Sequence, residues 1–98
     1  MFNYRYFFMS KETKIKLVKD IDVTDIAGDK VIVDFETGKY YMLKGTAADI
    51  WENIQTETTL GALVDVLTST YDVDEDTCLK GTVAFLNQMA DVNFVTLS

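Results

Sequence analysis

The side chains best suited to chemistry in this chain are carboxylates, and they gather in two short stretches. The first stretch, Asp20 to Asp29, holds four aspartates and one glycine. Its spacing misses the EF-hand pattern and lacks the glutamate that closes a calcium loop at the twelfth position. The second stretch, Tyr71 to Asp76, precedes a predicted helix, where Asp74 is a suitable N-cap. No nucleophile, base or phosphate loop lies near this second stretch, so we expect no catalytic residue and no enzyme activity.

The composition excludes several further classes of function. The chain has no histidine and a single cysteine, so the usual zinc sites and an internal disulfide are excluded, and we expect no metal and no other cofactor. A single cysteine is typical of a reducing compartment, and we expect a cytoplasmic protein. The net charge of −7 opposes binding to the phosphates of nucleic acids. No apolar run reaches the roughly 18 residues of a membrane span.

The elements that could position a binding site begin with a hairpin. Lys30 to Phe35 and Lys39 to Leu43 are rich in strand-forming residues, and the turn Glu36-Thr37-Gly38 joins them. Gly38 can take the left-handed conformation that such a turn needs. The predicted core face leaves Asp34 in water and consists of Val31, Val33, Phe35, Tyr41 and Leu43.

A third strand is predicted upstream of the hairpin. Lys14 to Lys19 alternates charged and apolar residues, as a strand at or near a sheet edge does, and we expect it to pair with the strand from Val31 to Phe35. The stretch between them is then a connection. The aromatic segment Phe2 to Phe8 predicts either a frayed tail or a β segment that pairs with a sheet edge. We expect an N-terminal extension over residues 1–13 and one domain over residues 14–98.

Three helices are predicted after the hairpin. The first begins at Thr46, which can form a capping box with Asp49, and it places Trp51 in the core. The second begins near Thr59, and the third spans about residues 75–91. The order of elements predicts an α+β fold of the winged helix-turn-helix type, with a three-stranded antiparallel sheet followed by three helices.

The third helix carries two apolar stripes at helical spacing. The inward stripe consists of Leu79, Val83, Leu86 and Ala90. The second stripe is displaced around the helix and consists of Cys78, Thr82, Phe85 and Met89. A helix on one small sheet needs only one stripe. The second stripe therefore packs on a dimer partner, a docked peptide or the aromatic N-terminus, unless the helix is buried on both sides.

These segments together resemble the PqqD-like family, whose members are leader-peptide recognition elements of ribosomally made, modified peptides (RiPP recognition elements). The resemblance covers about Lys14 to Val95 and is carried by the hairpin ETGKYYML, the helix start TAADIW and the turn YDVDEDT. The small, free-standing form looks most like the leader-binding proteins of lasso-peptide pathways. Asn93 stands where the family usually has glycine, and we expect it to supply the left-handed C-cap that glycine usually provides. Phe2 to Phe8 has no counterpart in the family pattern.

The resemblance implies that a leader peptide adds as a strand beside the third strand and lies against the third helix. The implied peptide-binding residues are Lys39, Tyr40, Tyr41, Met42 and Leu43 on the strand, and Cys78, Thr82, Phe85 and Met89 on the helix. Phe85 is the predicted hot spot, and Met89 can adapt its shape to the guest. The acidic chain would favour a leader with basic residues. The protein would then deliver the precursor to a separate leader peptidase, cyclase or radical enzyme.

Two other classes of function remain open. A winged-helix DNA-binding regulator would place its third helix in the major groove, but Lys80 is the only cation of that helix. A structural homodimer could form through the exposed edge strand and residues 1–8. We therefore expect a peptide partner, no nucleic acid and no membrane, with a homodimer as the alternative.

Overall fold

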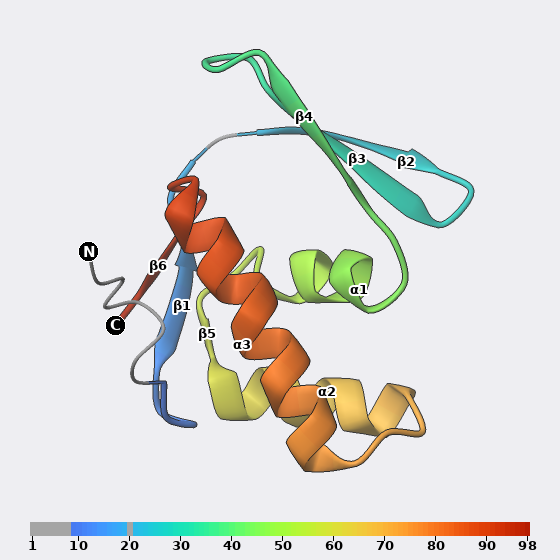
Figure 1. The fold of residues 1–98 in the computed structure, drawn as a ribbon, viewed down its shortest axis with the longest axis vertical. Coiled ribbons are helices and arrows are strands. Elements are labelled where there is room, and N and C mark those ends of the chain that lie inside the picture. The colour runs from blue at the N-terminus through green and yellow to red at the C-terminus, as the bar shows by residue number, and fades with distance from the viewer. Residues whose placement is uncertain (1–8, 20) are drawn as a thin grey trace.

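The computed structural model describes residues 9–19 and 21–98 (Figure 1). In the view of Figure 1, one small sheet lies at the top of the molecule, the three helices lie below it, and the second sheet lies beside the helices. The elements are β1 (Lys14–Leu17), β2 (Asp22–Ile26), β3 (Asp29–Asp34), β4 (Lys39–Leu43), α1 (Thr46–Asn53), β5 (Thr58–Thr59), α2 (Leu60–Thr70), α3 (Glu75–Asp91) and β6 (Val95–Leu97).

The predicted fold class is confirmed, because a three-stranded antiparallel sheet, β2-β3-β4, precedes the three helices. The predicted membership of that sheet is wrong. Its first strand is Asp22–Ile26, which the sequence indicated to be a connection, and it pairs with β3 from Asp22↔Val33 to Ile26↔Asp29. Every residue of β2 is exposed, so no apolar periodicity marks it. The turn Ala27-Gly28 holds it in place, with φ of 53° and 91°, as a type I′ hairpin requires.

The strand that we expected to pair with β3 lies in a second sheet, of order β5-β1-β6. β1 is bonded on both sides, since Ile15 lies opposite Thr58 on one flank and Leu97 on the other. β1 is therefore the middle strand of a small sheet, next to both of its edges, and the predicted pairing with β3 is wrong. Its two partners have two and three residues, which is too short for periodicity to reveal them.

The face of β3 that meets the core is the opposite of the predicted one. Ile32 is fully buried and lies opposite Tyr41, so these two side chains share the inner face. Val31 and Val33 are half-buried on the outer face, and Phe35 lies beyond the end of the strand with 76% of its surface exposed. The prediction is correct only for Tyr41 and Leu43 on β4, which point inward.

The inner position of Asp34 explains the reversal. Its side chain is 4% exposed and accepts hydrogen bonds from Lys19 Nζ at 3.0 Å, Thr37 Oγ1 at 3.1 Å and the Glu36 N–H at 3.1 Å. Burial raises the pKa of the Asp34 carboxyl, but the hydrogen bonds outweigh burial and hold the pKa below its ordinary value. The prediction that Asp34 lies in water is therefore wrong, because its charge is paired within the fold.

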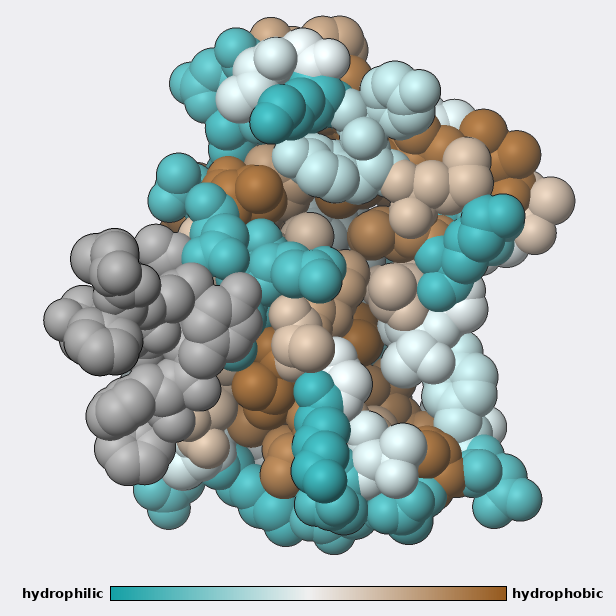
Figure 2. Space-filling view, viewed as in Figure 1, coloured by the Kyte–Doolittle hydropathy of each residue, from teal (hydrophilic) through white to brown (hydrophobic). Residues whose placement is uncertain are grey.

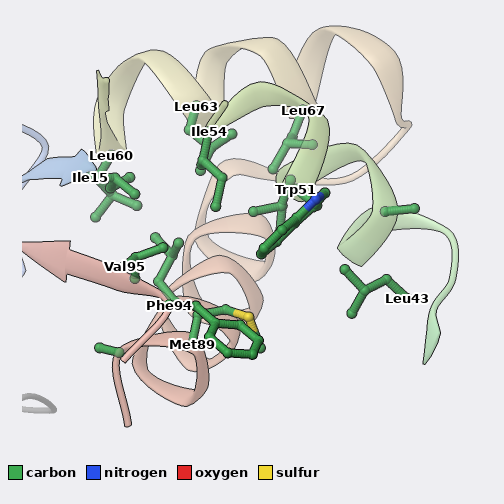
Figure 3. Close-up of a cluster of buried hydrophobic side chains, with 14 of the residues drawn as sticks. Ile15, Leu43, Trp51, Ile54, Leu60, Leu63, Leu67, Met89, Phe94 and Val95 are labelled. Atoms are coloured by element: carbon green, nitrogen blue, oxygen red, sulfur yellow. The ribbon is translucent and has the colours of Figure 1, made fainter. Parts of the chain in front are cut away.

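Aromatic rings join the β2-β3-β4 sheet to the helices. The ring of Phe94 makes edge contacts with Tyr41 of β4, at 5.5 Å between centroids, and with Trp51 of α1, at 6.2 Å. Figure 3 shows Trp51 and Phe94 within one buried cluster that also holds Leu43 and Met89. The predicted core position of Trp51 is confirmed, since it is 2% exposed.

The N-termini of α2 and α3 and the C-terminus of α3 lie where local residues predicted them. Asp74 Oδ2 accepts the N–H of Thr77 at 3.1 Å, so the expected N-cap of α3 is confirmed. α2 begins directly after Thr59, as predicted, and Thr59 Oγ1 accepts the N–H of Ala62 at 3.2 Å as its cap. Asn93 has φ of 64° after the end of α3, which confirms its left-handed conformation.

The predicted capping box of α1 is wrong. The N-cap is Gly45, with φ of 57°, and no side chain caps the helix. The Asp49 carboxylate instead accepts a hydrogen bond from the hydroxyl of Tyr71, which follows α2. Asp49 therefore bonds to a residue distant in the chain instead of to the start of its own helix, and this hydrogen bond ties α1 to the turn before α3.

The prediction for Phe2 to Phe8 concerns residues outside the described part of the chain. Just downstream, the carbonyls of Lys11 and Thr13 accept the N–H groups of Gly61 and Leu60, each at 2.9 Å. The residues directly before β1 thus contact the start of α2. In residues 9–19 and 21–98, no helix has the length and apolar character needed to cross a bilayer.

Candidate functional site

β4 lies at one edge of the β2-β3-β4 sheet. Among the described residues, β3 is the only strand that pairs with it, from Lys39↔Asp34 to Leu43↔Lys30. In an antiparallel ladder, backbone groups point alternately to the two sides of a strand, so about half of those of β4 face away from β3. A sheet edge of this kind can pair with another extended chain.

The five predicted strand residues divide between the two faces of the sheet. Tyr41 is half-buried against Phe94, and Leu43 is 5% exposed in the core. Tyr40 and Met42 point to the outer face and are 72% and 54% exposed. Lys39 is exposed beside the hairpin turn. Only Tyr41 and Leu43 therefore face the helices, and Tyr40 and Met42 face the opposite side.

A cavity of about 440 Å³ lies where the N-terminal end of α1, the C-terminal end of α2 and the first half of α3 meet. This volume lies within the range of small-ligand sites. Its walls are mostly apolar, with hydroxyl groups and one carboxylate among them. The lining residues are Thr46, Ala47, Ile50, Leu67, Tyr71, Asp72, Val73, Thr77, Cys78, Gly81, Thr82 and Phe85.

Three of the four predicted helix residues line this cavity. They are Cys78, Thr82 and Phe85. Cys78 and Thr82 are buried, with 3.9 Å between the sulfur and the hydroxyl oxygen, while Phe85 is half-buried. Met89 is 4% exposed and lies beside Phe94 in the core cluster (Figure 3). Much of the second stripe of α3 thus lines the cavity, and its last residue packs inside the protein.

The cavity lies near the C-terminal end of β4, because its first lining residue, Thr46, follows Leu43 by three positions. Figure 2 shows hydrophobic residues in the middle of this face, between the β2-β3-β4 sheet above and the helices below. A peptide strand beside β4 could therefore form main-chain hydrogen bonds along that strand and place one apolar side chain in the cavity at its end.

A polar contact fixes one wall of the cavity. Tyr71 donates its hydroxyl proton to Asp49, and this hydrogen bond, with burial as a smaller cause, raises the pKa of Tyr71 above its ordinary value. The phenol of Tyr71 therefore stays protonated at neutral pH, and the contact is a structural tie between α1 and the turn before α3. Asp72 is exposed and adds a negative charge to the lining.

Sequence reasoning missed most of the cavity lining. Residues from α1 and α2, such as Ala47 and Leu67, were predicted only as helix and core residues. Gly81 was the one local signal of a cavity. It lies inside α3, where glycine lowers helix stability by about 1 kcal/mol relative to alanine. A Cβ atom at Gly81 would meet no atom within 4 Å, so the glycine leaves this wall of the cavity open.

In the described part of the chain, no group of three histidine, cysteine, aspartate or glutamate residues is arranged to hold a metal ion. Asp25 pairs with Lys30 at 2.6 Å, and Asp74 caps α3. Those two side chains therefore stabilise the fold.

Comparison with known proteins adds two findings. A family model described as "Coenzyme PQQ synthesis protein D (PqqD)" matches residues 29–95. The solved structure "TbiB1 in Complex with the TbiA(beta) Leader Peptide" is similar, with a TM-score of 0.73 and 22% sequence identity, over 82% of this chain and 93% of that one. At this identity the likeness concerns the fold. Comparison with curated proteins returns no significant match.

Proposed function

The chain belongs to the PqqD family, and from that premise we propose that it binds the leader segment of a ribosomally synthesised precursor peptide. The observation that carries the proposal is the open edge of β4 close to an apolar cavity lined by α3. The similar fold of TbiB1, whose structure holds a leader peptide, supports the same use of this architecture.

The leader would bind by β-augmentation. Its backbone would pair with the free N–H and C=O groups of Lys39 to Leu43, which provides affinity without requiring a particular sequence. Alternate side chains of an added strand point to opposite faces of the sheet. One set of leader side chains would therefore face the helices, and the other set would face the same side as Tyr40 and Met42.

Selectivity would come from the cavity. An apolar leader side chain that fills it would contact Cys78, Thr82 and Phe85, and Phe85 is the residue that we expect to contribute most to the affinity. Asp72 and the net charge of −7 would favour basic residues around that anchor, with an effect that weakens as salt increases. The buried position of Met89 assigns it a supporting role behind this wall.

We assign no chemical step to this protein. It would hold the precursor in the cytoplasm for a separate leader peptidase, cyclase or radical enzyme, and its small size fits the leader-binding proteins of lasso-peptide pathways best. The DNA-binding alternative is weaker, because Lys80 Nζ on α3 already lies 3.2 Å from Asp76 Oδ2. The homodimer alternative would use the same edge of β4 and therefore compete with the leader.

The test is a titration of isotope-labelled protein with the synthetic leader of a precursor encoded beside the gene. We expect amide shifts concentrated at residues 39–43 and 77–85. Phe85→Ala should weaken leader binding at least tenfold, because truncation of a central aromatic anchor commonly removes 2 kcal/mol or more. Val66→Ala on the exposed surface of α2 is the matched control and should bind normally.

Circular dichroism must show that both variants are folded. A folded Phe85→Ala variant with unchanged affinity, or shifts confined to surfaces other than β4 and the cavity, would contradict the proposed site. Concentration-dependent dimerisation that the leader does not disturb would favour a structural homodimer instead.

A further inference from the structure

The hydrogen bond between Tyr71 and Asp49 joins two walls of the cavity that come from different helices. Tyr71 follows α2 directly and lines the cavity, while Asp49 lies in the first turn of α1. In the view of Figure 1, the start of α1 and the turn between α2 and α3 both lie on the right side of the molecule. The nearby hydroxyl of Thr77 bonds instead to Asp74, at the start of its own helix. The phenol of Tyr71 is therefore placed to set the separation of the two walls.

The first turn of α1 has no side-chain cap. Its N-cap is Gly45, with φ of 57°, and no side chain of the described residues caps the helix. The helix has eight residues, which is too short for stability by itself. Its large buried side chains, Ile50 and Trp51, lie further along. The hydrogen bond from Tyr71 to Asp49 therefore holds the end of α1 that lines the cavity.

This hydrogen bond adds direction to a contact that apolar packing already stabilises. Ile50 of α1 and Leu67 of α2 both line the cavity and are 2% and 1% exposed, so the two helices pack together without a polar contact. Burial of apolar surface has no preferred direction, whereas an O–H···O contact requires a defined geometry. Because Tyr71 and Asp49 are half-buried, their bond adds little net stability. Its main effect is on the position of the Tyr71 ring and of the first turn of α1.

We propose that Tyr71 and Asp49 determine which leader side chains the cavity accepts, because their hydrogen bond holds two walls of the cavity at a fixed separation. The inference rests on the proposed function and goes beyond it, since it names residues that select among leaders. A wall held in place excludes side chains that are too large and leaves space around those that are too small. Tyr71 and Asp49 are thus positioning residues, while Phe85 provides most of the affinity.

The strength of the hydrogen bond limits the size of the effect. If a large side chain must break the bond to enter, the discrimination against it cannot exceed the free energy of the bond. One hydrogen bond typically changes an equilibrium constant by a factor of about 5. Loss of the bond should therefore change the relative affinity for large and small leader side chains by about fivefold.

The first step of the experiment identifies the leader residue that occupies the cavity. The probe is the synthetic leader of the precursor encoded beside the gene, with each apolar residue replaced in turn by alanine. Gly81→Leu extends a side chain from α3 into the cavity. The residue sought is the one whose replacement weakens binding to the original protein but has little effect on binding to Gly81→Leu. Isothermal titration calorimetry then compares two leaders, with valine and with tryptophan at that position.

Two variants remove the hydrogen bond from opposite sides. Tyr71→Phe keeps the ring that lines the cavity, and Asp49→Ala keeps the phenol. Asp49→Asn is the conservative control, because its amide oxygen can still accept the phenol proton. Asp74→Ala is the control for stability, because it removes the cap on the Thr77 N–H and Asp74 is not part of the cavity lining.

We expect Tyr71→Phe and Asp49→Ala each to shift the ratio of the two affinities by about fivefold in favour of the tryptophan leader, because the wall can then move outward. Asp49→Asn and Asp74→Ala should leave the ratio close to that of the original protein. A purely structural role would weaken the binding of both leaders equally. An unchanged ratio in folded Tyr71→Phe and Asp49→Ala would overturn the inference, and so would an equal shift in Asp74→Ala.

These outcomes are distinct from failure of the proposed function. If Gly81→Leu changes the effect of no leader residue, the cavity does not receive the leader, and the proposed role of the cavity fails together with this inference. If such a residue is found and the ratio does not change, the cavity still receives the leader, and only the role of Tyr71 and Asp49 fails.

Discussion

Gly81 offers a direct test of the cavity, because one position can be filled by two side chains of different length. It lies inside α3, lines the cavity and would accept a Cβ atom with no neighbour within 4 Å. Gly81→Ala adds a methyl group at the cavity wall. Gly81→Leu adds a branched chain that can extend into the roughly 440 Å³ space. The first substitution should leave room for a leader side chain, and the second should occupy that room.

Both substitutions should stabilise the protein. Replacing a helical glycine by alanine gains about 0.5–1 kcal/mol, and leucine has nearly the same helix propensity while also burying apolar surface. For a chain of this length, the gain corresponds to a rise in melting temperature of about 2–5 °C. Any loss of binding in Gly81→Leu therefore cannot be attributed to unfolding.

The effects on leader binding should differ. A leucine in the cavity would displace an apolar leader side chain whose burial is worth about 1.5–3 kcal/mol, which is a loss of affinity of roughly 10-fold to 150-fold. Alanine should change the affinity less than threefold. Isothermal titration calorimetry with the leader, together with thermal unfolding of both variants, provides the measurement. Equal leader affinity of the two variants, both folded and stabilised, would refute the role assigned to the cavity.

Two further predictions concern the fold. Asp34→Asn should lower the melting temperature at pH 7, and the difference from the original protein should shrink below about pH 4. The reason is that folding lowers the pKa of Asp34. The ionised carboxylate therefore stabilises the fold above its unfolded pKa of about 3.9, and this stabilisation is lost as the pH falls through the folded-state pKa. A difference that stays constant from pH 7 to pH 2 would contradict the pairing with Lys19. Asp74→Ala should lower the free energy of unfolding by about 1 kcal/mol, since it removes the cap on the Thr77 N–H, and chemical denaturation would measure the change. Leader affinity should change little. A large loss of affinity would place Asp74 in the binding site.

Elements with strong local signals could be predicted from the sequence. Thr59 and Asp74 marked the starts of two helices, and Gly38 and Asn93 take the left-handed conformations that were expected of them. The bounds of α3 agree with the prediction. Each of these features depends on a side chain and backbone groups within a few residues, so neighbouring positions in the chain contain the necessary information.

The candidate site was predictable only in part, because some of its residues share one helix and the rest come from segments far apart in the chain. The second stripe of α3 follows from helical spacing, and three of its residues line the cavity. The cavity itself depends on the meeting of three helices, and no single segment indicates it. Met89 belongs to the same stripe, yet Phe94 and its neighbours enclose it in the core.

The sequence by itself determined the order of the helices, where α2 and α3 begin and the family to which the chain belongs, because these depend on local spacing and residue type. Only the tertiary structure decided that β2 replaces β1 beside β3, and that β3 has its charges inside and its valines outside. β2 has no buried side chain to mark it, and the inward Asp34 becomes favourable only when Lys19 lies 3.0 Å away. Partners distant in the chain therefore determine which face of the sheet is core and which is free to bind.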